Sequence, residues 1–181
     1  MIKRIGTILL VGVLGAGIAV GAASAAEETQ AQKPAPKPAK VENVGDPVVD
    51  VSLPAHDGKS ARLAQLVGKK GKSVVIWAQS ACGSCRNELG RLRELKKKFP
   101  DVNFVVVMVD VGGREIAGKL IKKYGITDIA TVLYDTEFKT SELFNVFVTP
   151  AVLIFKDGKL AVRLVNLNPR KDFVGNALAT L

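Results

Sequence analysis

Cysteine and histidine are scarce in this sequence: its 181 residues include only two cysteines and one histidine. A zinc half-site built on the two cysteines would need at least two further ligands, which the chain cannot supply from cysteine and histidine. The second cysteine, Cys85, is followed by Arg86 rather than by histidine, so the pattern that attaches c-type haem is missing. We therefore expect neither a metal nor a cofactor.

Acidic residues are also in the minority: the chain has 17 Asp and Glu but 26 Lys and Arg, which gives a formal net charge of +9. The basic residues are scattered, with Asp and Glu interleaved, and no nucleic-acid-binding motif accompanies them. This pattern favours a solvated basic surface, and we expect no nucleic-acid partner. Hydrophobic residues make up 48% of the chain, which is enough for one ordinary packed domain.

The N-terminal segment is uncharged over residues 5–26 and is preceded by Lys3 and Arg4. Within it, Ala23-Ser24-Ala25 has the small-x-small pattern of a signal-peptidase site, so we expect residues 1–25 to be a signal peptide cleaved after Ala25. The same run is long enough to span a bilayer as an uncleaved anchor, which is the alternative. Both interpretations predict a periplasmic or other extracytoplasmic location, with membrane attachment only if the segment is retained.

Residues 26–44 are polar and repetitive, and prolines alternate with other residues at 33–38. Alternating prolines keep a segment extended and prevent it from packing, so this stretch is predicted to be a linker. The globular domain is expected to occupy residues 45–181.

Apolar patterning in this domain predicts helices that alternate with strands before a terminal hairpin. This order is typical of an α/β domain with a mixed sheet. The expected strands are 50–53, 73–78, 103–111, 131–134, 151–155 and 160–165, and the expected helices are 63–67, 82–98, 116–124, 141–147 and 169–181.

The two cysteines form the motif Cys82-Gly83-Ser84-Cys85, between a buried strand and a helix. Thiols at this spacing can cycle between dithiol and disulfide with little movement of the backbone. A bridge that closes so short a loop removes little chain entropy, so structural stabilisation is a poor reason for it. The helix N-terminus favours a thiolate at Cys82, which makes this residue the candidate nucleophile.

Two segments, 77–89 around the motif and 148–158 around Val148-Thr149-Pro150, carry a family resemblance. Together with the order of strands and helices, they make the chain resemble the thioredoxin superfamily, and most closely its extracytoplasmic TlpA and ResA type. The resemblance covers about residues 45–181. It implies a thioredoxin-like fold, in which helices flank a mixed central sheet, with an N-terminal extension and a central helix-strand insertion around residues 114–134.

The resemblance also implies roles for three residues outside the motif. Pro150 would follow a cis peptide bond opposite the dithiol, and Thr149 would present its backbone to an incoming peptide. Glu88, one helical turn after Cys85, would manage protons during thiol exchange; a solvent-facing glutamate is the alternative. The chain departs from the family at Ala81, where a tryptophan is usual, and at the Gly-Ser pair between the cysteines.

The function expected from these features is that of a cell-envelope thiol-disulfide oxidoreductase that reduces protein disulfides. Cys82 would attack the substrate, Cys85 would resolve the mixed disulfide, and Glu88 would assist. By resemblance, a membrane reductant donor of the DsbD or CcdA type would regenerate the dithiol, and the substrates could include apocytochromes c.

Two other functions are alternatives. A peroxiredoxin-like peroxidase would want Thr or Ser three residues before the reactive cysteine, where this chain has Gln79. A copper chaperone of the SCO kind would need a wider cysteine spacing and a histidine downstream, whereas His56 lies upstream and is expected on a surface loop.

Overall fold

The computed structural model describes residues 39–68, 70–165, 167–168 and 171–181. The predicted signal peptide and most of the predicted linker lie outside the described residues. Within the described ranges, no helix combines the length and the apolar character needed to cross a membrane.

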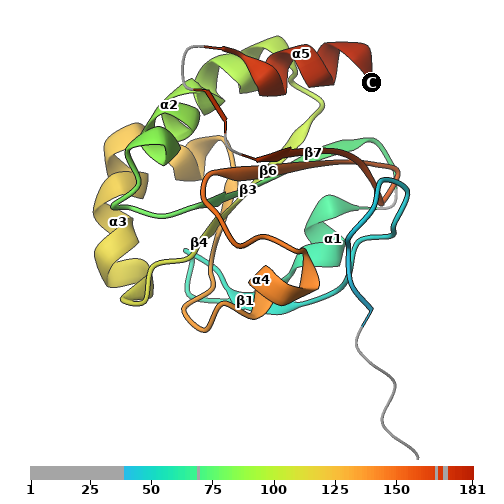
Figure 1. The fold of residues 1–181 in the computed structure, drawn as a ribbon. Helices are drawn as coiled ribbons and strands as arrows, with labels where there is room; N and C mark the ends of the chain where they lie inside the picture. The colour runs from blue at the N-terminus through green and yellow to red at the C-terminus, as the bar shows by residue number, and fades with distance from the viewer. Residues whose placement is uncertain (1–38, 69, 166, 169–170) are drawn as a thin grey trace, which may run out of the picture. The chain divides into compact units, whose positions relative to one another are not determined.

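A five-stranded mixed sheet forms the centre of the domain, in the order β5-β4-β3-β6-β7 (Figure 1). The neighbours β3–β4 and β4–β5 are parallel, whereas β3–β6 and β6–β7 are antiparallel. The sheet therefore confirms the predicted mixed α/β class. Its strands are β3 (Lys72–Ala78), β4 (Asn103–Met108), β5 (Thr131–Tyr134), β6 (Ala151–Lys156) and β7 (Lys159–Val165).

Both faces of the central strand β3 are buried, because helices cover the sheet on each side. Side chains alternate along a strand, so Val74 and Ile76 pack on one face while Val75 and Trp77 pack on the other. The helices α2 (Gly83–Lys98), α3 (Gly113–Tyr124) and α5 (Phe173–Thr180) cover the first face (Figure 1). The short helices α1 (Leu63–Val67) and α4 (Lys139–Leu143) lie on the second, and the 3-10 turn η1 (Ile126–Asp128) follows α3.

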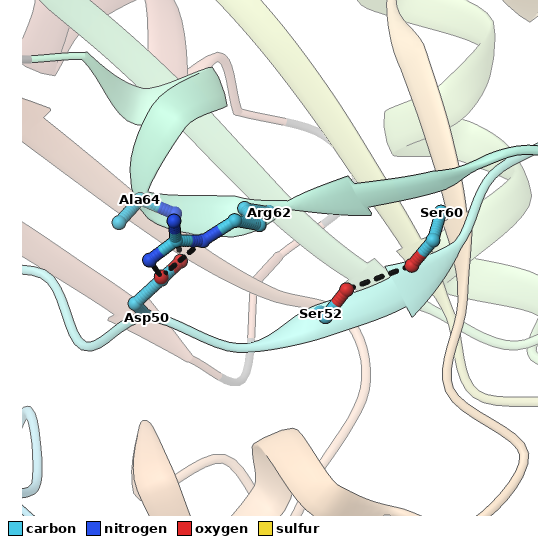
Figure 2. Close-up of polar contacts among 5 residues, drawn as sticks. All are labelled: Asp50, Ser52, Ser60, Arg62 and Ala64. Carbon is cyan, nitrogen blue, oxygen red and sulfur yellow. Dashed lines mark hydrogen bonds and ion pairs between the residues drawn. The ribbon is translucent and has the colours of Figure 1, made fainter.

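A two-stranded hairpin precedes the sheet, formed by β1 (Ser52–Pro54) and β2 (Ser60–Arg62). Only its first strand was expected from the sequence. Figure 2 shows the polar contacts that hold it: the Arg62 guanidinium contacts the Asp50 carboxylate, and the hydroxyls of Ser52 and Ser60 lie 2.7 Å apart across the strands.

The N-terminal part of the domain runs along both edges of the sheet. Pro47 forms an isolated bridge with Lys159 at the β7 edge, and Ala55 forms one with Leu133 at the β5 edge. Packing begins before the predicted start of the domain at residue 45, because Val41 is fully buried and its N–H donates to the Leu143 carbonyl at 2.7 Å.

Most elements differ from their predicted bounds by a few residues; for example, α3 begins at Gly113 instead of residue 116, and α4 ends at Leu143 instead of residue 147. Two of the differences have an identifiable cause. Strand β4 ends at Met108 instead of residue 111, because the chain then turns so that Asp110 can bind Ser80. Helix α4 begins at Lys139 instead of residue 141, because the Asp135 carboxylate accepts hydrogen bonds from the N–H groups of Lys139 and Thr140.

Candidate active site

The two cysteines lie at the start of α2, as the sequence predicted. Cys82 is the N-cap residue and has an extended backbone, and the Cys85 N–H donates to its sulfur at 3.1 Å. The pair forms a disulfide with a Cα–Cα distance of 5.2 Å. Cys85 is fully buried, whereas Cys82 is only partly buried, so a partner can reach the first sulfur and not the second.

The surroundings of Cys82 suit an anionic sulfur. The backbone N–H of Cys85 points at it, and the Ser84 hydroxyl lies 3.4 Å away. The 16-residue helix α2 adds its positive N-terminal end. In the reduced protein these groups would favour a thiolate at Cys82.

The proline loop faces this sulfur from the other side of the site. The Thr149–Pro150 peptide bond is cis, which confirms the expectation from the family resemblance. The Thr149 carbonyl oxygen lies 3.6 Å from Cys82 Sγ, although the two residues are far apart in sequence. This is a contact without a hydrogen bond in the disulfide form, because the sulfur then carries no proton. Thr149 therefore lies where a partner bonded to Cys82 would meet its backbone.

Glu88 is buried, with 5% of its surface exposed, which excludes the solvent-facing alternative. Burial raises the pKa of its carboxyl group, the Arg91 guanidinium lowers the pKa, and the Asp172 carboxylate raises it. Arg91 Nη1 lies 3.3 Å from Glu88 Oε1. Glu88 is one helical turn beyond Cys85, about 4.5 Å along the axis. The site therefore contains a buried carboxyl group whose protonated form is favoured relative to an exposed glutamate.

Asp110 is a site residue that the sequence prediction missed. It is 4% exposed and accepts hydrogen bonds from the Ser80 N–H, at 3.1 Å to each carboxylate oxygen, and from the Ser80 hydroxyl. Arg86 donates to the Ser80 carbonyl at 3.2 and 3.0 Å. The loop before Cys82 is therefore held from both sides.

A pattern in the sequence could have revealed Asp110. It follows an apolar strand, β4, that lies parallel to β3, and the carboxyl ends of parallel strands meet at one edge of a sheet. The motif Cys82–Cys85 follows β3 at that same edge. An acidic residue directly after the second strand was therefore a candidate neighbour of the loop.

A cavity of about 770 Å³ adjoins the site on the side of the proline loop. Its wall is largely apolar, and Phe147 and Val148 remain 71% and 47% exposed. The buried Trp77 indole donates to the Thr140 hydroxyl at 2.8 Å, which holds α4 beside the cavity. The lining residues nearest the motif in sequence or space are Trp77, Gln79, Val109, Val148 and Thr149.

His56, the histidine considered for copper, lies elsewhere. Its Nδ1 is 2.6 Å from the Tyr134 hydroxyl, and burial raises the pKa of that phenol. No group of three His, Cys, Asp or Glu side chains able to hold a metal ion occurs among the described residues.

Comparison with known families identifies the fold. The AhpC/TSA family matches residues 44–163. The chain belongs to the AhpC/TSA family. No curated protein matched this AhpC/TSA-family chain.

Solved structures extend this finding. A putative thiol:disulfide interchange protein DsbE from Chlorobium tepidum is 22% identical, with a TM-score of 0.66, over 76% of this chain and 96% of that one. A secreted Mycobacterium tuberculosis disulfide oxidoreductase homologous to E. coli DsbE is 23% identical, with a TM-score of 0.59, over 72% and 96%. A peroxiredoxin-like protein from Aquifex aeolicus is 20% identical, with a TM-score of 0.62, over 79% and 90%. These likenesses confirm the thioredoxin fold that the motifs indicated.

Proposed function

We propose that this AhpC/TSA-family protein is a thiol-disulfide oxidoreductase that reduces disulfides in other proteins. The observation that carries the proposal is the Cys82–Cys85 disulfide at the start of α2, with one accessible sulfur that faces Thr149 and one buried sulfur. This asymmetry separates the roles of attack and resolution.

The reaction begins with the reduced protein. The Cys82 thiolate attacks one sulfur of a substrate disulfide, the substrate S–S bond breaks, and a mixed disulfide forms while the other substrate sulfur leaves as a thiolate. Cys85, once deprotonated, attacks Cys82 Sγ and releases the second substrate sulfur. The substrate gains two electrons, and the protein is left with the intramolecular disulfide seen in the structure.

Glu88 would accept the proton of Cys85 in the resolving step. Its position one turn along the same helix and its burial support this role. The raised pKa of its carboxyl group brings it closer to the pKa of a thiol, which makes proton exchange between the two easier.

The dithiol must be regenerated by a reductant, for which we propose a membrane dithiol donor of the DsbD or CcdA type. An extracytoplasmic location follows from the predicted signal peptide, residues 1–25. Apocytochromes c are a proposed substrate class. The N-terminal sequence is the support for this compartment. The support for a donor is that a lone CxxC pair in an oxidising compartment stays a disulfide unless a reductant acts on it.

Reduction of insulin disulfides with dithiothreitol as the electron source tests the function. We expect Cys82→Ser to lose all turnover and Cys85→Ser to accumulate mixed disulfides that gel electrophoresis detects without reductant. Full turnover by Cys82→Ser would remove the nucleophile assignment. The reduction potential of the pair then distinguishes a reductase, with a low potential, from an oxidase.

A peroxidase is the second candidate, favoured by the match to the AhpC/TSA family over residues 44–163. In this reaction the Cys82 thiolate would attack a peroxide O–O bond to give a sulfenic acid and an alcohol or water. Cys85 would then displace water to form the disulfide. Consumption of peroxide by the reduced protein, measured beside insulin reduction, decides between the two.

A further inference from the structure

A second groove lies beside the loop that precedes the redox site. It has a volume of about 390 Å³ and lies between the loop before Cys82 and helix α3. Ala81, directly before Cys82, forms part of its wall. The groove therefore comes within one residue of Cys82 along the chain.

Three cations line this groove. Arg86 comes from the first turn of α2, and Lys119 and Lys123 come from successive turns of α3. All three are exposed, and in the part of the chain that the structure describes none of them forms an ion pair. Arg86 is held in place because it donates to the Ser80 carbonyl.

Two carboxylates come close to these cations in the fold or along α3, and neither forms an ion pair with them among the described residues. Asp110 is buried and fully engaged with Ser80. Glu115 is exposed on α3, one turn before Lys119, and forms no ion pair among the described residues. Ile116 and Leu120 add apolar side chains to the lining. The groove thus combines positive charge that has no ion-pair partner among the described residues with apolar side chains in the same lining, which suits an acidic peptide.

We propose that this groove binds an acidic segment of the substrate protein, next to the substrate cysteine. Because three cations line the groove, the complementary ligand is a peptide with Asp or Glu, whose carboxylates would contact Arg86, Lys119 and Lys123. This inference rests on the proposed function and adds the substrate class to it.

Short peptides test the proposal, each with one cysteine blocked as a mixed disulfide with mercaptoethanol and flanked by Asp-Asp, Asn-Asn or Lys-Lys. Reduced wild-type protein should act fastest on the aspartate peptide and slowest on the lysine peptide. The double variant Lys119→Glu/Lys123→Glu should lower kcat/KM for the aspartate peptide by about tenfold and reverse the order, since two attractions become two repulsions. Turnover of the neutral 2-hydroxyethyl disulfide should not change.

The matched control is Lys97→Glu/Lys159→Glu, which changes the net charge equally at exposed positions away from the groove. Its peptide order should remain that of the wild type. An equal effect of both double variants would assign the preference to overall charge and overturn the proposal. The same holds if the wild type does not distinguish the peptides, or if the oxidised protein binds anionic vesicles through Lys119 and Lys123 in preference to the peptide.

Binding of the same peptides with serine in place of cysteine, measured by fluorescence anisotropy on the oxidised protein, separates this proposal from the proposed function. Preferred binding of the aspartate peptide without any disulfide reduction would refute the reductase function and support the groove. Reduction of all three peptides at one rate, with equal binding, would support the reductase and refute the groove.

Discussion

The Thr140 hydroxyl joins the active-site strand to the helix beside the cavity, so its removal should be costly. It accepts a hydrogen bond from Trp77 Nε1 at 2.8 Å and donates to Asp135 Oδ2 at 2.5 Å, and the residue is fully buried. Thr140→Val keeps the shape of the side chain but leaves the indole N–H without its acceptor and the carboxylate without one of its donors. Trp77 and Asp135 are both buried, at 0% and 1% exposure.

The expected cost follows from these two losses. An unsatisfied buried donor costs about 1–3 kcal/mol, and a hydrogen bond to a charged group contributes about 1.5–3 kcal/mol. The backbone N–H groups of Lys139 and Thr140 still bind Asp135, so we place the loss of unfolding free energy near the lower end of the summed range, at about 3 kcal/mol. For a domain of this size, this corresponds to a decrease of about 9 °C in Tm.

The control is Thr140→Ser, which retains the hydroxyl and loses a methyl group, at a cost of about 1 kcal/mol. Urea unfolding of both variants in the oxidised state gives the comparison, and Trp77, the only tryptophan in the chain, provides the fluorescence signal. If Thr140→Val is as stable as Thr140→Ser, the hydroxyl does not link the two elements and the reasoning fails.

Three further predictions concern other parts of the chain. Because burial raises the pKa of Glu88, the folded protein binds a proton there more tightly than the unfolded chain. The stability contributed by that proton is therefore lost as pH rises from about 4.3 through the folded-state pKa. Glu88→Gln should remove this pH dependence from urea unfolding and shift the pH profile of Cys82 alkylation; overlaid profiles would contradict a proton role. Asp110→Asn should make the loop around Ser80 exchange amide hydrogens faster, with Asp128→Asn, at an exposed position, as the control. Intact mass from an envelope fraction should give a mature chain that begins at Ala26, and a membrane-bound species that retains residues 1–25 would favour the anchor.

The sequence was sufficient for the elements that local pattern determines. The run Val74-Val75-Ile76-Trp77 is apolar and of strand length, which favoured a central strand, and the adjacent motif located the redox pair. The cis bond before Pro150 came from the family resemblance and not from the local sequence.

Residues whose roles depend on distant partners were harder to predict. Asp110 follows β4 and accepts a hydrogen bond from Ser80, which follows β3. Asp135 accepts a hydrogen bond from the first residue of α4, although the N-cap position itself holds Phe138, which cannot cap the helix with its side chain. Val41 follows a proline-rich stretch, and only its contact with Leu143 reveals that it belongs to the core. The burial of Glu88 was expected only from the family resemblance, because Arg91 and the start of α5 come close to it only in the fold.

The bridges of Pro47 to β7 and of Ala55 to β5 also affect how the molecules behave in a crowded solution. The outer strands of an open sheet expose unpaired backbone groups, which can recruit strands from other molecules into fibrils. Here a single stretch ahead of the sheet occupies part of each outer strand, and one of its two bridging residues is a proline, which cannot donate a backbone hydrogen bond. A molecule that lost the segment from Pro47 to Ala55 would expose the outer edges of both β5 and β7. We therefore expect this segment to protect the protein against self-association through its sheet edges.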